Sequence, residues 1–331
     1  MSPARLAPAL AQPSDGKAPP AGRIGALALL AGLFALAALA LLPDGGWLLV
    51  LTSLAFWASA SALTAAMARL EPKTTIGRRA LLLLIPLVFG LTLLLLWEFA
   101  VRGLAVPSVL LPPPSAIAAT IAASAHLLWA DFVQTFLKAV LAGYAIGCGA
   151  GFLAALLVDR SPFLKRGLLP IGNLVSALPI VGVAPIMVMW FGFDWPSKAA
   201  VVVVMTFFPM LVNTVAGLNA SSAMERDLMR TYAASHGQTL MKLRLPAALP
   251  FIFNALKINA TLALIGAIVA EFFGTPIVGM GFRISAEIGR MNTPMVWAEI
   301  AMAALVGSLS YGLVALIERR ATFWHPSIRK G

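Results

Sequence analysis

The side chains able to do chemistry are few in this sequence and lie far apart. Only 11% of the 331 residues are charged, and the single cysteine, Cys148, lies inside an apolar run. The three histidines, His126, His236 and His325, fall in separate segments, so we predict no disulfide framework and no metal site. The sequence contains no His-Glu-x-x-His, no Gly-x-Ser-x-Gly and no Gly-x-x-x-x-Gly-Lys-Ser/Thr phosphate loop. We therefore predict no catalytic residues, no enzyme activity and no nucleotide bound by this chain.

The clearest polar pattern lies between two apolar runs, at residues 220–250. Ser222 followed by Glu225 fits a capping box, in which each side chain accepts from a backbone N–H at the start of a helix. Gly237 suits the left-handed position that closes a helix. Between them, side chains recur on one side at three- and four-residue spacing: Leu228, Met229, Tyr232, Ala233 and His236. The pattern predicts one helix over 222–237, about 14 residues and roughly 21 Å long.

An isolated helix of this length is marginal in water, so its apolar side must rest on another surface. A second basic segment, QTLMKLR, follows and leads to Pro246 and Pro250, where the next apolar run begins. The residues alone leave two interpretations open. In the first, the helix lies on lipid headgroups, with its basic side chains on the phosphates: Arg226, Arg230, Lys242 and Arg244. In the second, it docks in a groove of another protein.

The elements on either side of this segment are long and apolar. The sequence is 60% hydrophobic, with a mean hydropathy of +0.91. Several apolar runs exceed the roughly 18 residues that indicate a membrane-spanning helix, and they are continuous, which argues against a barrel. We predict an all-α membrane protein, a polytopic helical bundle. Its eight expected spans lie near residues 24–42, 47–68, 80–101, 132–158, 168–192, 199–219, 251–273 and 296–317.

The net charge of +11 raises the possibility of a nucleic-acid partner, but the sequence has no basic face. The Lys and Arg residues stand in small groups between the apolar runs. Placing the N-terminus in the cytoplasm puts eighteen of the 24 basic residues on the cytoplasmic side and four on the opposite side. We therefore predict cytoplasmic N- and C-termini, a cytoplasmic loop at 220–250 and no nucleic acid.

Composition also suggests the domain organisation. Residues 1–23 are rich in Pro and Ala and are predicted to form a disordered tail. Residues 24–70 read as an additional transmembrane hairpin, and residues 71–79 as a basic cytoplasmic linker. The six remaining spans form a core at 80–320, followed by a tail at 321–331.

Small residues and prolines mark special positions within the spans. Gly143, Gly147 and Gly151 recur every four residues, a spacing that lets two helices touch, either within the bundle or between subunits. Interior prolines bend helices, often beside a pathway through the membrane, and two asparagines flank the 220–250 loop. The candidates for such a pathway are Pro179, Pro185, Pro209, Asn213 and Asn259. For the two asparagines, interhelical hydrogen bonds are the alternative interpretation. Glu271 is interpreted as structural.

The 220–250 loop resembles the signature of permease subunits of bacterial binding-protein-dependent ABC importers. That signature is Glu-Ala-Ala, three residues, Gly, nine residues, Ile, any residue, Leu-Pro. Its spacing falls without gaps on Asp227-Leu228-Met229, Ala233, Leu243 and Leu245-Pro246, with different residues at several positions. Further stretches similar to the nitrate, sulfonate and taurine type are LLLLWEFAVRG, LLPPPSAI, ALPIVGVAPIMVMWFGF, FFPMLVNTVAGL and LALIGAIVAEFFG, within residues 80–320.

The resemblance implies a six-span permease core, with two extra N-terminal helices, in a bacterial inner membrane. It implies that the loop is a coupling helix for a cytoplasmic ABC ATPase dimer, which binds the ATP and Mg. The positions that match or flank the signature are Arg226, Asp227, Leu228, Met229, Arg230, Tyr232, Ala233, His236, Gly237, Leu245 and Pro246. The other implied partners are a second permease copy, in a homodimer or a pair of related chains, and an extracytoplasmic solute-binding protein.

The resemblance also narrows the range of candidate solutes but does not identify one. Organic sulfonates, nitrate, and pyrimidine or flavin vitamin precursors all fit the family. The stretch ALPIVGVAPIMVMWFGFDWPSK favours the pyrimidine and flavin group. The alternatives from other classes are a secondary transporter or channel driven by an ion gradient, and a membrane scaffold that transports nothing.

Overall fold

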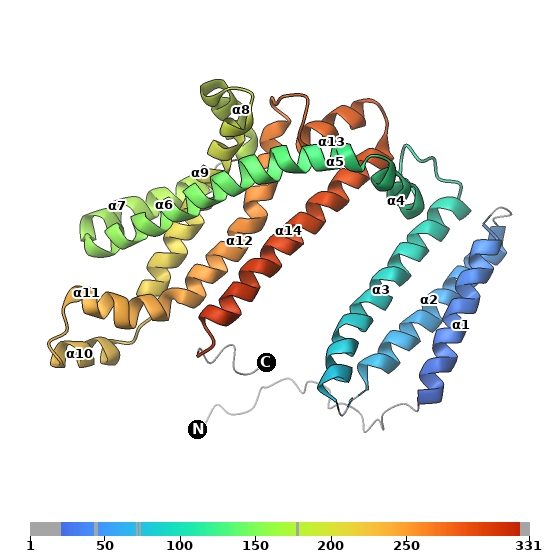
Figure 1. Cartoon of the computed structure of the whole chain (residues 1–331), viewed down its shortest axis with the longest axis horizontal. Helices are drawn as coiled ribbons and strands as arrows, with labels where there is room; N and C mark the ends of the chain where they lie inside the picture. The colour runs from blue at the N-terminus through green and yellow to red at the C-terminus, as the bar shows by residue number, and fades with distance from the viewer. Residues whose placement is uncertain (1–20, 43–45, 71, 73, 177–178, 325–331) are drawn as a thin grey trace, which may run out of the picture. The chain divides into compact units, whose positions relative to one another are not determined.

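The structure is a computed structural model that describes residues 21–42, 46–70, 72, 74–176 and 179–324. Most of the predicted N-terminal tail and residues 325–331 of the predicted C-terminal tail lie outside these residues. The described residues form helices and turns and contain no strand, as predicted for an all-α protein. The chain divides into two compact units, Met1–Ala118 and Ala119–Gly331. Each unit is described by itself (Figure 1).

The first unit contains three long apolar helices, α1 (Ala21–Ala40), α2 (Gly46–Ala68) and α3 (Thr75–Gly103). Helix α2 packs against both α1 and α3, around a core in which Phe56 meets Phe99 edge to face at 5.8 Å between ring centroids. The hydroxyl of Thr74 caps α3 by accepting from the backbone N–H of Gly77. The predicted boundary between hairpin and core, at residues 71–79, stays a prediction. Helix α4 (Pro114–Ala123) crosses the boundary between the two units.

The second unit opens with a continuous helical stretch, Ala125–Arg160. It comprises α5 (Ala125–Phe132), the π-helical segment η1 (Val133–Val140) and α6 (Leu141–Arg160). The elements that follow are α7 (Pro162–Ser176), α8 (Ile180–Phe191), α9 (Trp195–Leu218), α10 (Ala223–Thr231), α11 (His236–Thr239), the π-helical segment η2 (Leu240–Arg244), α12 (Leu245–Glu271), α13 (Met280–Gly289) and α14 (Thr293–Ala321).

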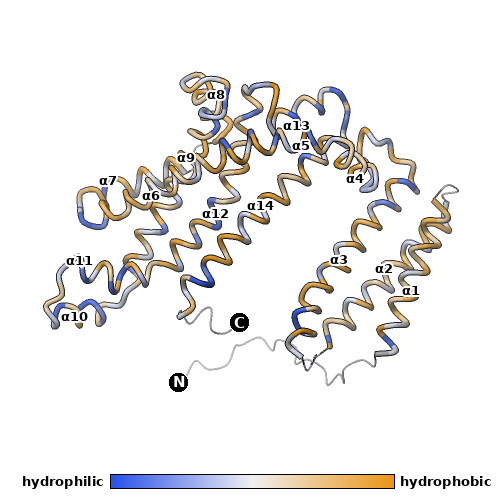
Figure 2. The backbone as a smooth tube through the Cα atoms, viewed as in Figure 1, coloured by the Kyte–Doolittle hydropathy of each residue, from blue (hydrophilic) through white to orange (hydrophobic). Residues whose placement is uncertain are grey.

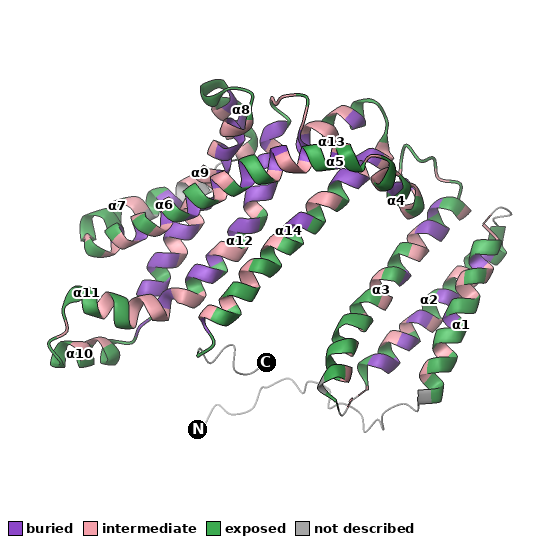
Figure 3. Ribbon diagram, in the orientation of Figure 1, coloured by how far each residue is buried: buried purple, intermediate pink, exposed green. Residues whose placement is uncertain are grey.

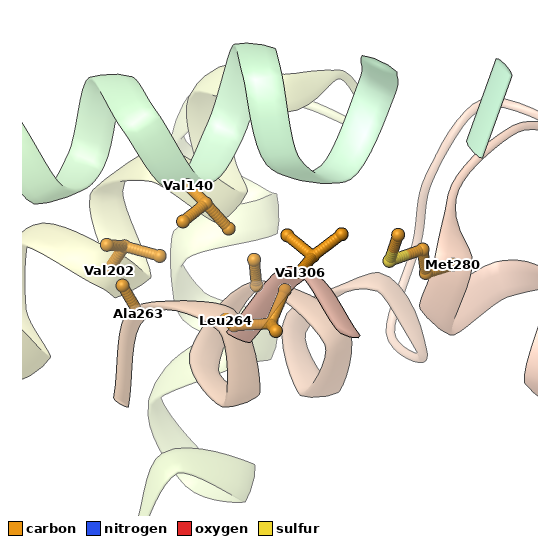
Figure 4. Packing of buried hydrophobic residues seen from close by; sticks show 7 residues of the cluster. Val140, Val202, Ala263, Leu264, Met280 and Val306 are labelled. Carbon is orange, nitrogen blue, oxygen red and sulfur yellow. The ribbon is translucent and has the colours of Figure 1, made fainter. Parts of the chain in front are cut away.

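Helix α9 is the centre of the second unit and packs on both α6 and α12. The glycines of α6 make this possible: a Cβ added to Gly143 would lie 2.6 Å from Cβ of Val202, closer than real atoms approach. The glycine stripe therefore packs α6 directly on α9 inside the unit. Around α9 and α12, buried side chains form the core cluster drawn in Figure 4: Val140, Val202, Ala263, Leu264, Ala267, Met280 and Val306.

Within the described residues, seven helices are long and apolar enough to cross a membrane (Figure 2). They correspond to seven of the eight predicted spans. The eighth predicted span, 168–192, is not one continuous helix, because α7 ends at Ser176 and α8 begins at Ile180. Pro179 stands immediately before α8, and proline disfavours the helical conformation of the residue before it and lacks an N–H. The sequence periodicity did not separate the two pieces because both are apolar.

Candidate functional site

Helix α10 projects at one end of the second unit, where α6 and α9 end and α12 begins (Figure 1). We call this the loop end. The predicted capping box is confirmed: the backbone N–H of Glu225 donates to Oγ of Ser222 at 3.2 Å, and the backbone N–H of Ser222 donates to the Glu225 carboxylate at 2.8 Å. The negative Glu225 also lies at the positive end of the helix dipole. The sequence thus fixes the start of α10 by local chemistry.

The prediction of one helix from 222 to 237 is wrong at its end. Helix α10 ends at Thr231, and Ala233 adopts the left-handed conformation with a φ of 51°. The N–H of Ala234 then donates to the carbonyl of Met229 at 2.9 Å, which closes the helix in a Schellman turn. A second capping box, Ser235 with Gln238, starts α11. Gly237 therefore lies inside α11 and not at a helix end.

The exposed side of this loop carries large apolar side chains. Tyr232 is 78% exposed and Met224 is 82% exposed. We give the name loop apolar surface to the exposed large apolar side chains of this loop: Met224, Leu228, Tyr232 and Met241. No residue of α10 or α11 is buried, and both helices are almost wholly exposed in Figure 3. Leu228 and Tyr232 were predicted here, whereas Met224 and Met241 were missed, although Met224 precedes Leu228 by one helical repeat of four residues.

The charged residues of α10 do not all lie together. Arg230 pairs with Asp227 at 3.3 Å between Nη1 and Oδ1, and both side chains are exposed. Arg226 instead turns back and donates to the carbonyl of Ser221 at 2.7 Å. Arg226 therefore stabilises the base of the loop, while Arg230 and Asp227 stay on its surface.

The remaining predicted loop residues differ in exposure. Ala233 and His236 are exposed, and Met229 is half-buried. Leu245 and Pro246 are also half-buried, and they begin α12. Leu245 packs against the apolar cluster that contains Leu218, Ala248 and Ile252. The last two positions of the signature therefore anchor α12 and do not extend the loop apolar surface.

The predicted pathway residues differ in their surroundings. Pro185 and Pro209 lie inside α8 and α9, and Pro209 lines a cavity of about 110 Å³. The other walls of this cavity are apolar: Val175, Ile180, Val183, Val201, Val204, Met205 and Leu262. Neither predicted asparagine lines it. Asn259 is fully buried and donates to the carbonyl of Thr206 at 2.8 Å and to Sγ of Cys148 at 3.2 Å, while Asn213 donates to the carbonyl of Pro209 within α9.

At the end of the unit away from the loop, three side chains accept from consecutive backbone N–H groups at the start of α13. Asp131 accepts from Gly279 at 2.6 Å and Thr135 accepts from Met280 at 2.8 Å. Glu271 accepts from Gly281 at 2.7 Å and is buried, in agreement with the structural interpretation. These contacts join α5, η1 and α12 to the start of α13.

Charged groups around this junction were not predicted as a group. Arg283 of α13 donates to Asp131 at 2.8 Å, and this hydrogen bond raises the pKa of the Arg283 guanidinium. The side chain of Gln134 donates to Asp194 at 2.8 Å and holds the pKa of that carboxyl below its usual value. Buried Lys198 donates to backbone carbonyls, among them that of Gly274. The partners lie too far apart in the sequence for spacing to connect them.

The part of the chain that matches known proteins contains the loop described above. Residues 147–323, which include α9, the loop and α12, match the family described as the binding-protein-dependent transport system inner membrane component. Over 239 residues the chain is 31% identical to a formylaminopyrimidine transport permease protein of Halalkalibacterium halodurans, covering 72% of this chain and 95% of that one.

Two further relatives are similar over most of their length. The chain is 31% identical over 237 residues to a riboflavin transport system permease protein of Chloroflexus aurantiacus, covering 71% of this chain and 88% of that one. It is 28% identical over 241 residues to a taurine transport system permease protein of Escherichia coli, covering 70% and 86% of the two chains.

Proposed function

The chain belongs to the inner membrane components of binding-protein-dependent transport systems, as an ABC importer permease of the nitrate, sulfonate and taurine type, and we propose that its loop apolar surface docks on a separate ATPase. By this proposal, the permease moves a small solute as the ATPase hydrolyses ATP. The proposal rests on one observation. Helix α10 is short, is capped at both ends, has no buried residue and exposes large apolar side chains.

The geometry favours a protein groove as the partner of α10. A capping box and a Schellman turn fix the helix at both ends, so it can transmit a displacement without unwinding. The exposed apolar side chains Met224, Leu228 and Tyr232 are spaced four residues apart. This spacing is typical of a helix that lies in a groove. The exposed pair of Asp227 and Arg230 beside them is suited to the polar rim of such an interface.

The chain is an integral inner-membrane protein, and we further propose its orientation and partners. Placing the loop end in the cytoplasm agrees with the distribution of Lys and Arg, which favours cytoplasmic N- and C-termini. The proposed complex holds two permease copies, two ATPase subunits that bind ATP and Mg, and an extracytoplasmic solute-binding protein. The 110 Å³ cavity beside Pro209 is lined by residues with apolar side chains.

We propose a pyrimidine or flavin vitamin precursor as the solute, with an organic sulfonate as the alternative. Two relatives at 31% identity are named for formylaminopyrimidine and riboflavin transport, and the taurine relative is less similar at 28%. Screening the cognate binding protein against a formylaminopyrimidine, riboflavin, taurine and nitrate tests this proposal. Selective binding of taurine or nitrate would contradict it.

Tyr232 provides the test of the docking proposal. Tyr232→Asp places a charge at the centre of the loop apolar surface, and desolvating that charge in an apolar groove is costly. We expect ATPase co-purification to be lost and solute uptake to fall by at least about tenfold, as removal of a central contact does at other interfaces. Tyr232→Phe keeps the ring and is the matched control, expected to behave as wild type. Retention of both ATPase and uptake in Tyr232→Asp would overturn the assignment.

A further inference from the structure

One guanidinium joins the loop to the ends of two other helices. Arg244 is the last residue of η2, where the loop passes into α12. Its Nη1 and Nη2 atoms donate to the two carboxylate oxygens of Asp159 at 2.7 and 2.6 Å, and its Nε donates to the carbonyl of Leu218 at 2.9 Å. Asp159 lies in the last turn of α6 and Leu218 ends α9. Arg244 therefore binds α6, α9 and the start of α12 together.

The geometry of this contact makes it rigid. The two parallel bonds to Asp159 fix both the distance and the plane of the guanidinium, which a lysine cannot do. The Arg244 and Asp159 side chains are only 12% and 6% exposed, so water screens their attraction weakly. The carbonyl of Leu218 is one of those that a helix leaves without a partner at its C-terminus, and a cation is favoured at that end.

The surrounding contacts extend this rigidity to α10. Arg226 at the start of α10 donates to the carbonyl of Ser221, and Ser221 is buried just beyond the end of α9. The base of the loop is thus held on both sides: by Arg226 where the chain enters the loop, and by Arg244 where it leaves. Beneath Arg244, Leu245 and Ala248 of α12 pack with Leu218. A displacement of α10 would reach the Arg244 contact through the chain that joins them, which passes from α10 through α11 and η2.

We propose that Arg244 is a positioning residue that transmits movement of the coupling loop to α6, α9 and α12 at once. This inference rests on the proposed docking of an ATPase at the loop apolar surface. Without the Arg244 contact, α10 would still dock, but its movement would be absorbed at the loop base before it reached α6 and α9. The loss would then appear in the solute moved for each ATP hydrolysed, and not in ATPase binding.

The chain offers a matched control pair. Lys257 of α12 and Glu318 of α14 form an ion pair with 2.7 Å between Nζ and Oε2, and their side chains are 17% and 15% exposed. This pair has a similar burial and one of its residues lies on α12, the helix that follows Arg244, but neither residue belongs to the loop, α6 or α9. Glu318→Gln breaks it in the same way that Asp159→Asn breaks the Arg244 pair.

The experiment uses the complex of permease, ATPase and binding protein in proteoliposomes. Arg244→Gln and Asp159→Asn are expected to keep ATPase co-purification within about twofold of wild type, while solute transported per ATP falls about tenfold, within the usual range of a coupling between two sites. Glu318→Gln should leave this ratio unchanged. Asp159→Glu keeps a carboxylate for Arg244 and should restore most of it.

The outcomes separate this inference from the proposed function. An unchanged ratio in both Arg244→Gln and Asp159→Asn, or an equal loss in Glu318→Gln, overturns the role of Arg244. Failure of the wild-type permease to bind any ATPase overturns the proposed function instead. If Arg244→Gln does not yield folded permease, Arg244→Lys decides, because it keeps the charge and loses the bidentate geometry; a wild-type ratio in that variant overturns the inference.

Discussion

At the scale of single residues, Ala233 is the most informative position in the loop. The family signature has glycine at this place, and the structure gives a physical reason, because the φ of 51° belongs to the left-handed region that glycine adopts without steric cost. Alanine here completes the same Schellman turn at some cost in local stability. The turn therefore depends on the backbone conformation and tolerates a residue other than glycine.

Ala233→Gly is expected to stabilise the loop locally by up to about 1.6 kcal/mol. Relief of the left-handed strain is worth about 1–2 kcal/mol, and the greater freedom of glycine in the open chain offsets about 0.4–1 kcal/mol of it. Hydrogen exchange of the Ala234 amide, which donates to Met229, measures the change as slower exchange. Ala234→Gly, at a position where φ is not positive, is the control and should speed the exchange of the neighbouring amides. Faster exchange at Ala234 in Ala233→Gly would contradict this account.

The two capping boxes show what residue patterns could and could not predict. Ser222 with Glu225 was predicted from spacing alone, and the structure confirms it. Ser235 with Gln238 has the same spacing, and it starts α11 at the place where Gly237 predicts the end of the first helix. The capping box prevails over the nearby glycine because it satisfies two backbone N–H groups with hydrogen bonds. Glycine only widens the backbone conformations that are allowed and adds no contact.

At the scale of elements, hydropathy predicted the long helices well and their irregularities poorly. Seven predicted spans are helices of sufficient length, because burial in lipid demands a continuous apolar run. The π-helical segments η1 and η2 were not predicted, since one extra residue per turn leaves the hydropathy of a long helix unchanged. The break before α8 had a signal in Pro179, which was interpreted as a kink within one span and proved to be a helix start.

The glycine stripe yields a prediction for the packing of α6 on α9. A Cβ at Gly147 would lie 2.9 Å from the carbonyl oxygen of Val203 and would clash with Oγ1 of Thr206, whereas a Cβ at Gly149 would meet open space. Gly147→Ala is therefore expected to destabilise the protein by about 1–3 kcal/mol through overpacking. Gly149→Ala should be neutral or stabilising by at most about 1 kcal/mol, because alanine favours the helix. Thermal unfolding in detergent compares the two, and equal transition temperatures would exclude the close packing of α6 on α9.

At the scale of the whole molecule, the two ends of the second unit carry different chemistry. The loop end has an exposed apolar surface and a guanidinium contact that joins three helices. The opposite end has buried contacts that join α13 to α5, η1 and α12. The family signature predicted where the loop of the first end lies, because its residues lie close together in sequence, but it did not predict the contact of Arg244 with Asp159 and Leu218. It gave no sign of the second, because Asp131 and Arg283 belong to distant segments that only the fold brings together.

We propose that this permease moves solute only when a separate ATPase acts on its loop. The most direct measurement is uptake of the solute that the binding protein retains, in proteoliposomes with the permease alone and with permease and ATPase, each with and without ATP. We predict uptake only when both the ATPase and ATP are present. Uptake by the permease alone, driven by an ion gradient or by the solute gradient, would contradict the account and identify a secondary transporter or a channel.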